Sequence, residues 1–210
     1  MKSMMKNIHL KLFFFISFAA ATNCFGQNKE NTGLINITKA TFLNPGISYE
    51  KRIAKLQSLY AQLFMNTSFS IGYSDALGNT SAIRFDPAAT LQYRYYYDKD
   101  QREAGGKNTQ MNNLNYVSFI TETSVITEKI VSVDNVEKVH RAINEFGIAW
   151  GLQRNYKSRF GLDLNVGPYY LFTKVTKQNS TGQFVTENVD KITISGRINL
   201  GFWLNQRNRN

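Results

Sequence analysis

The stretch FGLDLNVGPYYLF at residues 160–172 alternates between apolar and other side chains along its whole length. Successive side chains of an extended chain point to opposite faces, and this spacing predicts a strand with two unlike faces. One face carries Phe160, Leu162, Leu164, Val166, Pro168, Tyr170 and Phe172. The other face carries Gly161, Asp163, Asn165, Gly167, Tyr169 and Leu171.

The same alternation recurs along the chain, while helical periodicity is nearly absent. The expected strands are 34–43, 46–53, 58–73, 85–98, 115–129, 144–156, 160–172 and 192–204. Short connections at 54–57 and 156–159 alternate with polar segments at 74–84, 129–141 and 176–191, which we expect to be loops. Two connections break this order: 99–113 is long, and Asn44-Pro45-Gly46 forms a tight turn. The pattern predicts an all-β fold, an eight-stranded antiparallel up-and-down barrel with both termini at the short-turn end.

The first 26 residues have the composition of a secretory signal peptide. Lysines at positions 2, 6 and 11 precede the mostly apolar run 12–21, and Cys24-Phe25-Gly26 is a small-x-small cleavage pattern. We expect cleavage after Gly26, leaving residues 27–210 as one barrel domain. Two alternatives are a cut before Cys24 for lipidation and a membrane anchor, although a spanning helix needs about 20 apolar residues.

Cleavage after Gly26 leaves no cysteine and only one histidine, His140. Disulfides, thiolate catalysis and cysteine metal sites are then excluded. No ligand spacing indicates a metal site, and no cofactor is expected. The leader takes three lysines and no acid from the 25 basic and 15 acidic residues, so 22 basic and 15 acidic residues remain. This excess favours anionic partners such as lipid phosphates, whereas no basic run predicts nucleic-acid binding.

Composition indicates which face of the strands lies outside. The more polar face is mainly Gly, Ser, Thr, Asn and Gln, which suits the narrow interior of an eight-stranded barrel. Aromatic residues on the apolar face gather at both strand ends, as expected for girdles at the two interfaces of a membrane. The predicted membrane-interface aromatics are Tyr97, Tyr156, Phe160 and Phe202 at one end and Tyr73, Phe85, Tyr170 and Phe172 at the other.

With this pattern over residues 34–204, the chain resembles the small outer-membrane β-barrel proteins of the OmpA-transmembrane and OmpX type, especially the short Bacteroidota versions. The final strand, with Ile198, Leu200, Phe202 and Leu204, is similar to the signal for barrel-assembly machinery. The resemblance implies a monomeric protein in the outer membrane of a Gram-negative bacterium, surrounded by outer-membrane lipids and lipopolysaccharide. It also implies periplasmic termini and long loops outside the cell.

Ionisable residues on the inward face must pair, because burying a lone charge is costly. The expected lumen charges are Glu50, Arg52, Asp86, Arg94, Glu122, Glu145, Asp163 and Arg197. They form either a structural plug or a gated polar path.

The leading hypothesis is a non-enzymatic outer-membrane barrel with a structural or surface-interaction role. A narrow porin and a soluble, exported lipocalin-like carrier are two alternatives. The third is a lipid A-modifying enzyme that uses His140 with Ser124 or Ser132, although His140 can equally be a solvated loop residue.

Overall fold

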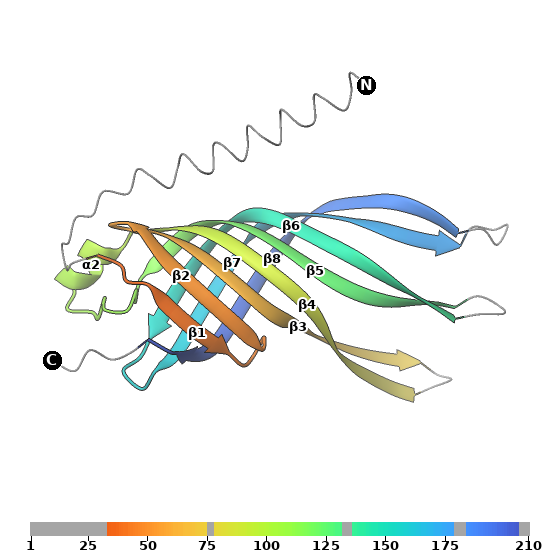
Figure 1. Ribbon diagram of the computed structural model, residues 1–210, viewed down its shortest axis with the longest axis horizontal. Helices are drawn as coiled ribbons and strands as arrows, with labels where there is room; N and C mark the ends of the chain where they lie inside the picture. The colour runs from red at the N-terminus through yellow and green to blue at the C-terminus, as the bar shows by residue number, and fades with distance from the viewer. Residues whose placement is uncertain (1–32, 75–77, 132–135, 179–183, 206–210) are drawn as a thin grey trace, which may run out of the picture. The chain divides into compact units, whose positions relative to one another are not determined.

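The computed structural model describes residues 33–74, 78–131, 136–178 and 184–205. These ranges form a closed barrel of eight antiparallel strands that pair in chain order, and β1 pairs with β8 to complete the ring (Figure 1). The predicted eight-stranded antiparallel barrel is therefore confirmed. The expected signal peptide lies outside the described residues. The strands are β1 (Ile37–Thr41), β2 (Gly46–Ala54), β3 (Gln57–Ser74), β4 (Gly78–Tyr96), β5 (Asn115–Val131), β6 (Val136–Asn155), β7 (Phe160–Gln178) and β8 (Phe184–Trp203).

Three segments predicted to be loops are mostly strand, so this part of the prediction was wrong. The described residues of 74–84, 129–141 and 176–191 belong to the strands of the hairpins β3–β4, β5–β6 and β7–β8. We call the end of the barrel that carries these hairpins the hairpin end. Both faces of a projecting two-stranded ribbon meet the same surroundings, and the alternation that identifies a half-buried strand is lost there.

The strand pairs β3–β4, β5–β6 and β7–β8 separate from one another toward the hairpin end (Figure 1). The β4–β5 ladder begins at Ala88↔Ser124, although both strands extend further. The β6–β7 ladder likewise stops at Ile143↔Thr173. The closed part of the barrel therefore gives way to separate ribbons.

The opposite end, which we call the turn end, is closed by the long connection between β4 and β5. This connection contains α2 (Lys99–Ala104). Within the described ranges, no helix is long and apolar enough to cross a membrane. After α2, Leu114 packs with Leu34, Tyr96 and Tyr116 in a buried cluster. Asn112 Nδ2 donates to the Ile35 carbonyl oxygen at 2.9 Å. The long connection at 99–113 therefore covers the turn end of the barrel.

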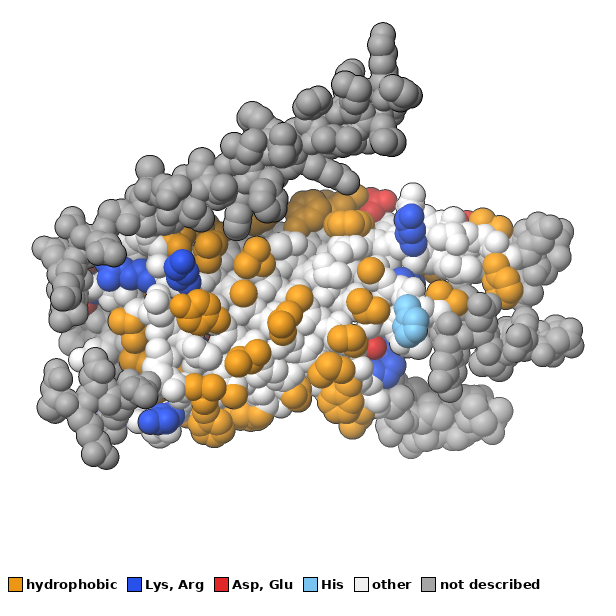
Figure 2. Space-filling view, viewed as in Figure 1, with side chains coloured by type: hydrophobic (Ala, Val, Ile, Leu, Met, Phe, Trp, Pro, Cys, Tyr) orange, Lys and Arg blue, Asp and Glu red, His pale blue; other side chains and the backbone are white. Residues whose placement is uncertain are grey.

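The barrel has apolar side chains outside and polar side chains inside, as the alternation at 160–172 predicts. Asp163 is 2% exposed, whereas Leu63 is 65% and Ile194 80% exposed. Figure 2 shows hydrophobic side chains over the visible wall, with Lys and Arg nearer its two ends. This distribution is the reverse of that in a water-soluble barrel.

Candidate functional site

The lumen of the barrel contains two groups of paired charges, of which the one nearer the turn end is centred on Arg94. The Arg94 side chain is fully buried. Its Nη1 donates to Asp163 Oδ2 and to Gln153 Oε1, each at 2.8 Å, and Nε donates to Gln92 Oε1 at 2.8 Å. The guanidinium carbon lies 3.8 Å from the ring centroid of Tyr60 and 4.3 Å from that of Tyr116. Arg94 is therefore held by hydrogen bonds in its plane and by aromatic rings against its faces.

Glu50 is connected to the same group through Gln153. Gln153 Nε2 donates to Glu50 Oε2 at 3.0 Å. Glu50 Oε1 accepts from Ser58 Oγ at 2.7 Å and from the Tyr96 hydroxyl. Asp163 Oδ1 accepts from the Tyr116 hydroxyl at 2.6 Å. Both carboxylates are thus hydrogen-bonded, which offsets part of the cost of burying them.

Lys39, which sequence reasoning did not select, adds a second basic residue to this group, since it interacts electrostatically with Asp163 and Glu50. Its side chain is buried, and its Nζ has no hydrogen-bond partner within the described part of the chain. Two buried basic residues, Arg94 and Lys39, accompany two buried acidic residues, Glu50 and Asp163. We call these four residues and their hydrogen-bond partners the Arg94 network.

On the hairpin-end side of the Arg94 network, other side chains fill the middle of the lumen. Ile120, Ala149 and Tyr169 form a second buried cluster. Near it, Gln62 Oε1 accepts from the Tyr60 hydroxyl at 2.8 Å and from Asn199 Nδ2 at 3.3 Å. Apolar and hydrogen-bonded side chains therefore occupy the space between the two charged groups.

The second charged group lies nearer the hairpin end and is centred on Arg197 of β8. Arg197 Nε lies 2.9 Å from Glu122 Oε2, and Nη2 lies 2.6 Å from Glu145 Oε2. Glu122 and Glu145 are direct neighbours on β5 and β6. The Arg197 guanidinium also lies 4.7 Å from the Tyr169 ring centroid. We call this group the Arg197 network, in which one cation separates two carboxylates that would otherwise repel each other.

Two of the predicted lumen charges join neither network. Asp86 is buried, and its Oδ2 lies 3.9 Å from Nε of the half-exposed Arg84. Arg52 lies at the turn end beside an irregularity in the β2–β3 ladder, and its Nε donates to the Ala54 carbonyl oxygen at 3.2 Å in an exposed bond. Arg52 keeps the inward parity of Ser48 and Glu50, opposite the buried Ser58, and its side chain is partly exposed at the turn end.

Several residues of the lumen were missed at the sequence level. Tyr60, Tyr96 and Tyr116 occupy inward positions of the alternation, and that parity was a usable signal for placing them inside. Gln153 had the same signal. Lys39 had a weaker one, because the segment 34–43 alternates poorly.

Five of the predicted membrane-interface aromatics lie in two clusters on the outward face: Tyr156, Phe160 and Phe202 in one, and Tyr170 and Phe172 in the other. At the turn end, Phe160 lies 6.0 Å from Tyr156, 6.3 Å from Phe202 and 6.5 Å from Phe42, between ring centroids. At the hairpin end, Phe146, Tyr170 and Phe172 lie within 6.3 Å of one another. Phe85 and Tyr97 are also exposed on the wall. The side chain of Tyr73 lies outside the described residues.

The residues considered for catalysis do not come together. His140 is exposed, and its Nδ1 lies 3.1 Å from Thr127 Oγ1. Ser124 is buried on the inward face of β5, and Ser132 lies outside the described residues. The described residues also contain no group of three or more His, Cys, Asp and Glu side chains suited to hold a metal ion.

Gly151 provides the space that Tyr116 needs within the Arg94 network. A Cβ at Gly151 would overlap the ring and hydroxyl of Tyr116. We expect Gly151→Ala to lower the free energy of unfolding by about 1–3 kcal/mol, because overpacking displaces Tyr116 from Asp163. Urea unfolding followed by tryptophan fluorescence measures this change.

The matched control for this substitution is Gly105→Ala, whose added Cβ would lie 3.4 Å from the Gln101 carbonyl oxygen, an ordinary contact. It should shift the unfolding midpoint much less. Equal shifts for the two variants would mean that the space beside Tyr116 is not what Gly151 provides.

No protein-family model, curated protein or solved structure matches the chain.

Proposed function

We propose that the protein is an outer-membrane β-barrel with a structural or surface-interaction role, whose plugged lumen supports three projecting hairpins. In this proposal the middle of the wall contacts lipid, the turn end faces the periplasm and the hairpin end faces outward from the cell. The single observation that carries the proposal is the polarity of the barrel, which has aliphatic side chains outside and paired charges inside.

The outward wall is difficult to reconcile with water. Ile148 is 58% exposed, and it lies among other exposed aliphatic and aromatic side chains on every long strand. Soluble monomers rarely expose a contiguous apolar patch larger than a few hundred Å². Each Å² of apolar surface moved from water to lipid gains roughly 25 cal/mol, so a bilayer stabilises this wall.

The two aromatic clusters have a spacing that fits a bilayer. Phe160 and Phe172 both lie on the outward face of β7. At roughly 3.3 Å per residue, the strand covers about 40 Å between them. With the tilt of about 40° that is usual for such barrels, the height becomes about 30 Å, close to the apolar band of about 25 Å that aromatic girdles flank.

The packed lumen favours a structural role over a channel. Between the capped turn end and the Arg197 network lie the Arg94 network and the cluster of Ile120, Ala149 and Tyr169. An eight-stranded barrel has an interior just wide enough for side chains to fill. The hairpins beyond the closed part then present most of the surface available to partners in solution.

Cell fractionation tests this proposal. We expect the mature chain in the outer-membrane fraction, with a gel mobility that changes on heating because the folded barrel resists detergent. Recovery in the soluble periplasmic fraction would overturn the proposal and favour the lipocalin-like carrier.

The same purified protein separates a plug from a channel. We expect no stepwise conductance when it is added to planar bilayers, because side chains fill the lumen. Regular conductance steps from heat-modifiable, folded protein would favour the narrow porin.

A further inference from the structure

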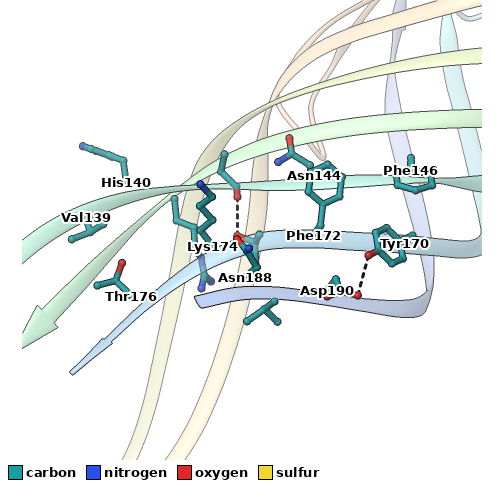
Figure 3. Close-up of a pocket in the computed structure, with 14 residues that line it drawn as sticks. Val139, His140, Asn144, Phe146, Tyr170, Phe172, Lys174, Thr176, Asn188 and Asp190 are labelled. Atoms are coloured by element: carbon teal, nitrogen blue, oxygen red, sulfur yellow. Dashed lines mark hydrogen bonds between the residues drawn. The ribbon is translucent and has the colours of Figure 1, made fainter. Parts of the chain in front are cut away.

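A pocket opens on the outside of the wall where β6 and β7 separate (Figure 3). The last paired residues there are Ile143 and Thr173. Thr173 Oγ1 donates to the carbonyl oxygen of Ala142 at 2.8 Å, which satisfies a backbone acceptor at the end of the ladder. Beyond this bond the two strands separate, leaving a cavity of about 730 Å³ lined by β6, β7 and β8. Its volume falls within the usual range for small-ligand sites.

The part of the pocket nearer the turn end is aromatic and continues into the apolar wall. Phe146, Tyr170 and Phe172 line it, and Figure 3 shows Phe172 extending from β7 toward Asn144 on β6. In the β7–β8 ladder Tyr170 is opposite Ile192, and Pro168 is opposite Ile194. These two isoleucines are 78% and 80% exposed. A hydrocarbon chain leaving the pocket would therefore run directly onto exposed aliphatic surface.

The part of the pocket nearer the hairpin end is polar and carries charged side chains. Its ionisable lining residues are His140, Arg141, Lys174 and Asp190. Asp190 Oδ2 accepts a hydrogen bond from the Tyr170 hydroxyl at 2.9 Å, beside the aromatic cluster. Asn144, Asn188 and Thr176 add neutral groups that can hydrogen-bond hydroxyls. Lys174 is exposed at this rim, and a lysine ammonium is a suitable phosphate partner.

We propose that this pocket binds a phosphorylated glycolipid, with its phosphate at Lys174, its sugar hydroxyls at the asparagines and its acyl chains over Phe146, Phe172 and Ile192. The inference rests on the proposed membrane location. The pocket lies at the hairpin-end aromatic cluster, the level at which a bilayer changes from hydrocarbon to headgroups. A free sugar would use the polar rim but would leave the adjoining aliphatic surface unused. A simple phospholipid would use the lysine and the wall but has no sugar ring for the amide-rich rim.

The test uses full-length mature protein purified in detergent and freed of lipid. Native mass spectrometry measures binding of a diphosphorylated glucosamine-disaccharide lipid, phosphatidylglycerol and phosphatidylcholine, each added separately. We expect the glycolipid to bind most tightly. Lys174→Glu should weaken its binding about tenfold by placing a carboxylate next to the phosphate, and Phe172→Ala should weaken it severalfold.

The matched control is Lys55→Glu, which makes the same charge change at an exposed position in the β2–β3 turn and should leave binding unchanged. Phosphatidylglycerol binding as tight as that of the glycolipid would overturn the inference, as would equal effects of Lys174→Glu and Lys55→Glu. Fractionation and heat-modifiable mobility of every variant separate this result from the proposed function. A folded, membrane-located Lys174→Glu variant with unchanged glycolipid binding refutes the pocket alone, whereas a soluble wild-type protein refutes the membrane location.

Discussion

Replacing Arg94 by methionine is expected to lower the free energy of unfolding by about 3–5 kcal/mol, the usual cost of removing one partner of a buried ion pair. Methionine preserves much of the volume but donates no hydrogen bond. Asp163, 2.8 Å from Nη1 in the wild type, would keep the Tyr116 hydroxyl but lose its cation. The side-chain oxygens of Gln92 and Gln153 would lose their Arg94 donors at the same time.

Reversible urea unfolding in phospholipid vesicles, followed by the fluorescence of Trp150 and Trp203, measures this loss. Arg52→Met makes the same chemical change where the side chain is partly exposed, and it should stay within about 0.5 kcal/mol of the wild type. Adding Asp163→Asn to Arg94→Met should recover part of the stability, because the second substitution neutralises the unpaired anion. If Arg94→Met and Arg52→Met unfold at the same urea concentration, the Arg94 network does not stabilise the barrel.

The strand pattern predicted the barrel and its polarity because both depend on properties local to each strand. In a closed ring each strand has one inward and one outward face, and side chains alternate between these two faces along the strand. Asp163 and Asn165 could therefore be placed inside without knowledge of any neighbouring strand. The same reasoning fails beyond the closed part, where the described ends of β3, β4, β7 and β8 have no enclosed face.

The partners of the lumen charges could not be predicted, because they depend on the stagger between strands. Arg197 on β8 meets Glu122 and Glu145 on β5 and β6, which lie across the lumen. A shift of one strand by one residue would turn these side chains to the other face. The pocket between β6 and β7 depends on where a ladder stops, which no residue pattern in either strand marks.

Arginine in place of Val166 should cost about 2–4 kcal/mol in a bilayer, which is the measured range for a lipid-facing arginine near the midplane. Val166 is 42% exposed on the outward face of β7, midway between Phe160 and Phe172. If these aromatics mark the two membrane interfaces, the new guanidinium lies at the greatest distance from water in either direction. In a water-soluble barrel the same side chain would be solvated, and the change would stay within about 0.5 kcal/mol.

Val185→Arg is the matched control, because Val185 is 43% exposed on the β8 part of a hairpin, beyond the aromatic cluster of Phe146, Tyr170 and Phe172. The residue type, the exposure and the introduced charge are the same, and only the expected depth in the membrane differs. Urea unfolding in vesicles should therefore separate the two variants by at least about 2 kcal/mol. The difference should fall when vesicles of shorter acyl chains bring water nearer to Val166. Equal unfolding free energies for the two variants in folded, vesicle-bound protein would mean that the middle of β7 does not face hydrocarbon. The aromatic clusters would then need an explanation other than a bilayer.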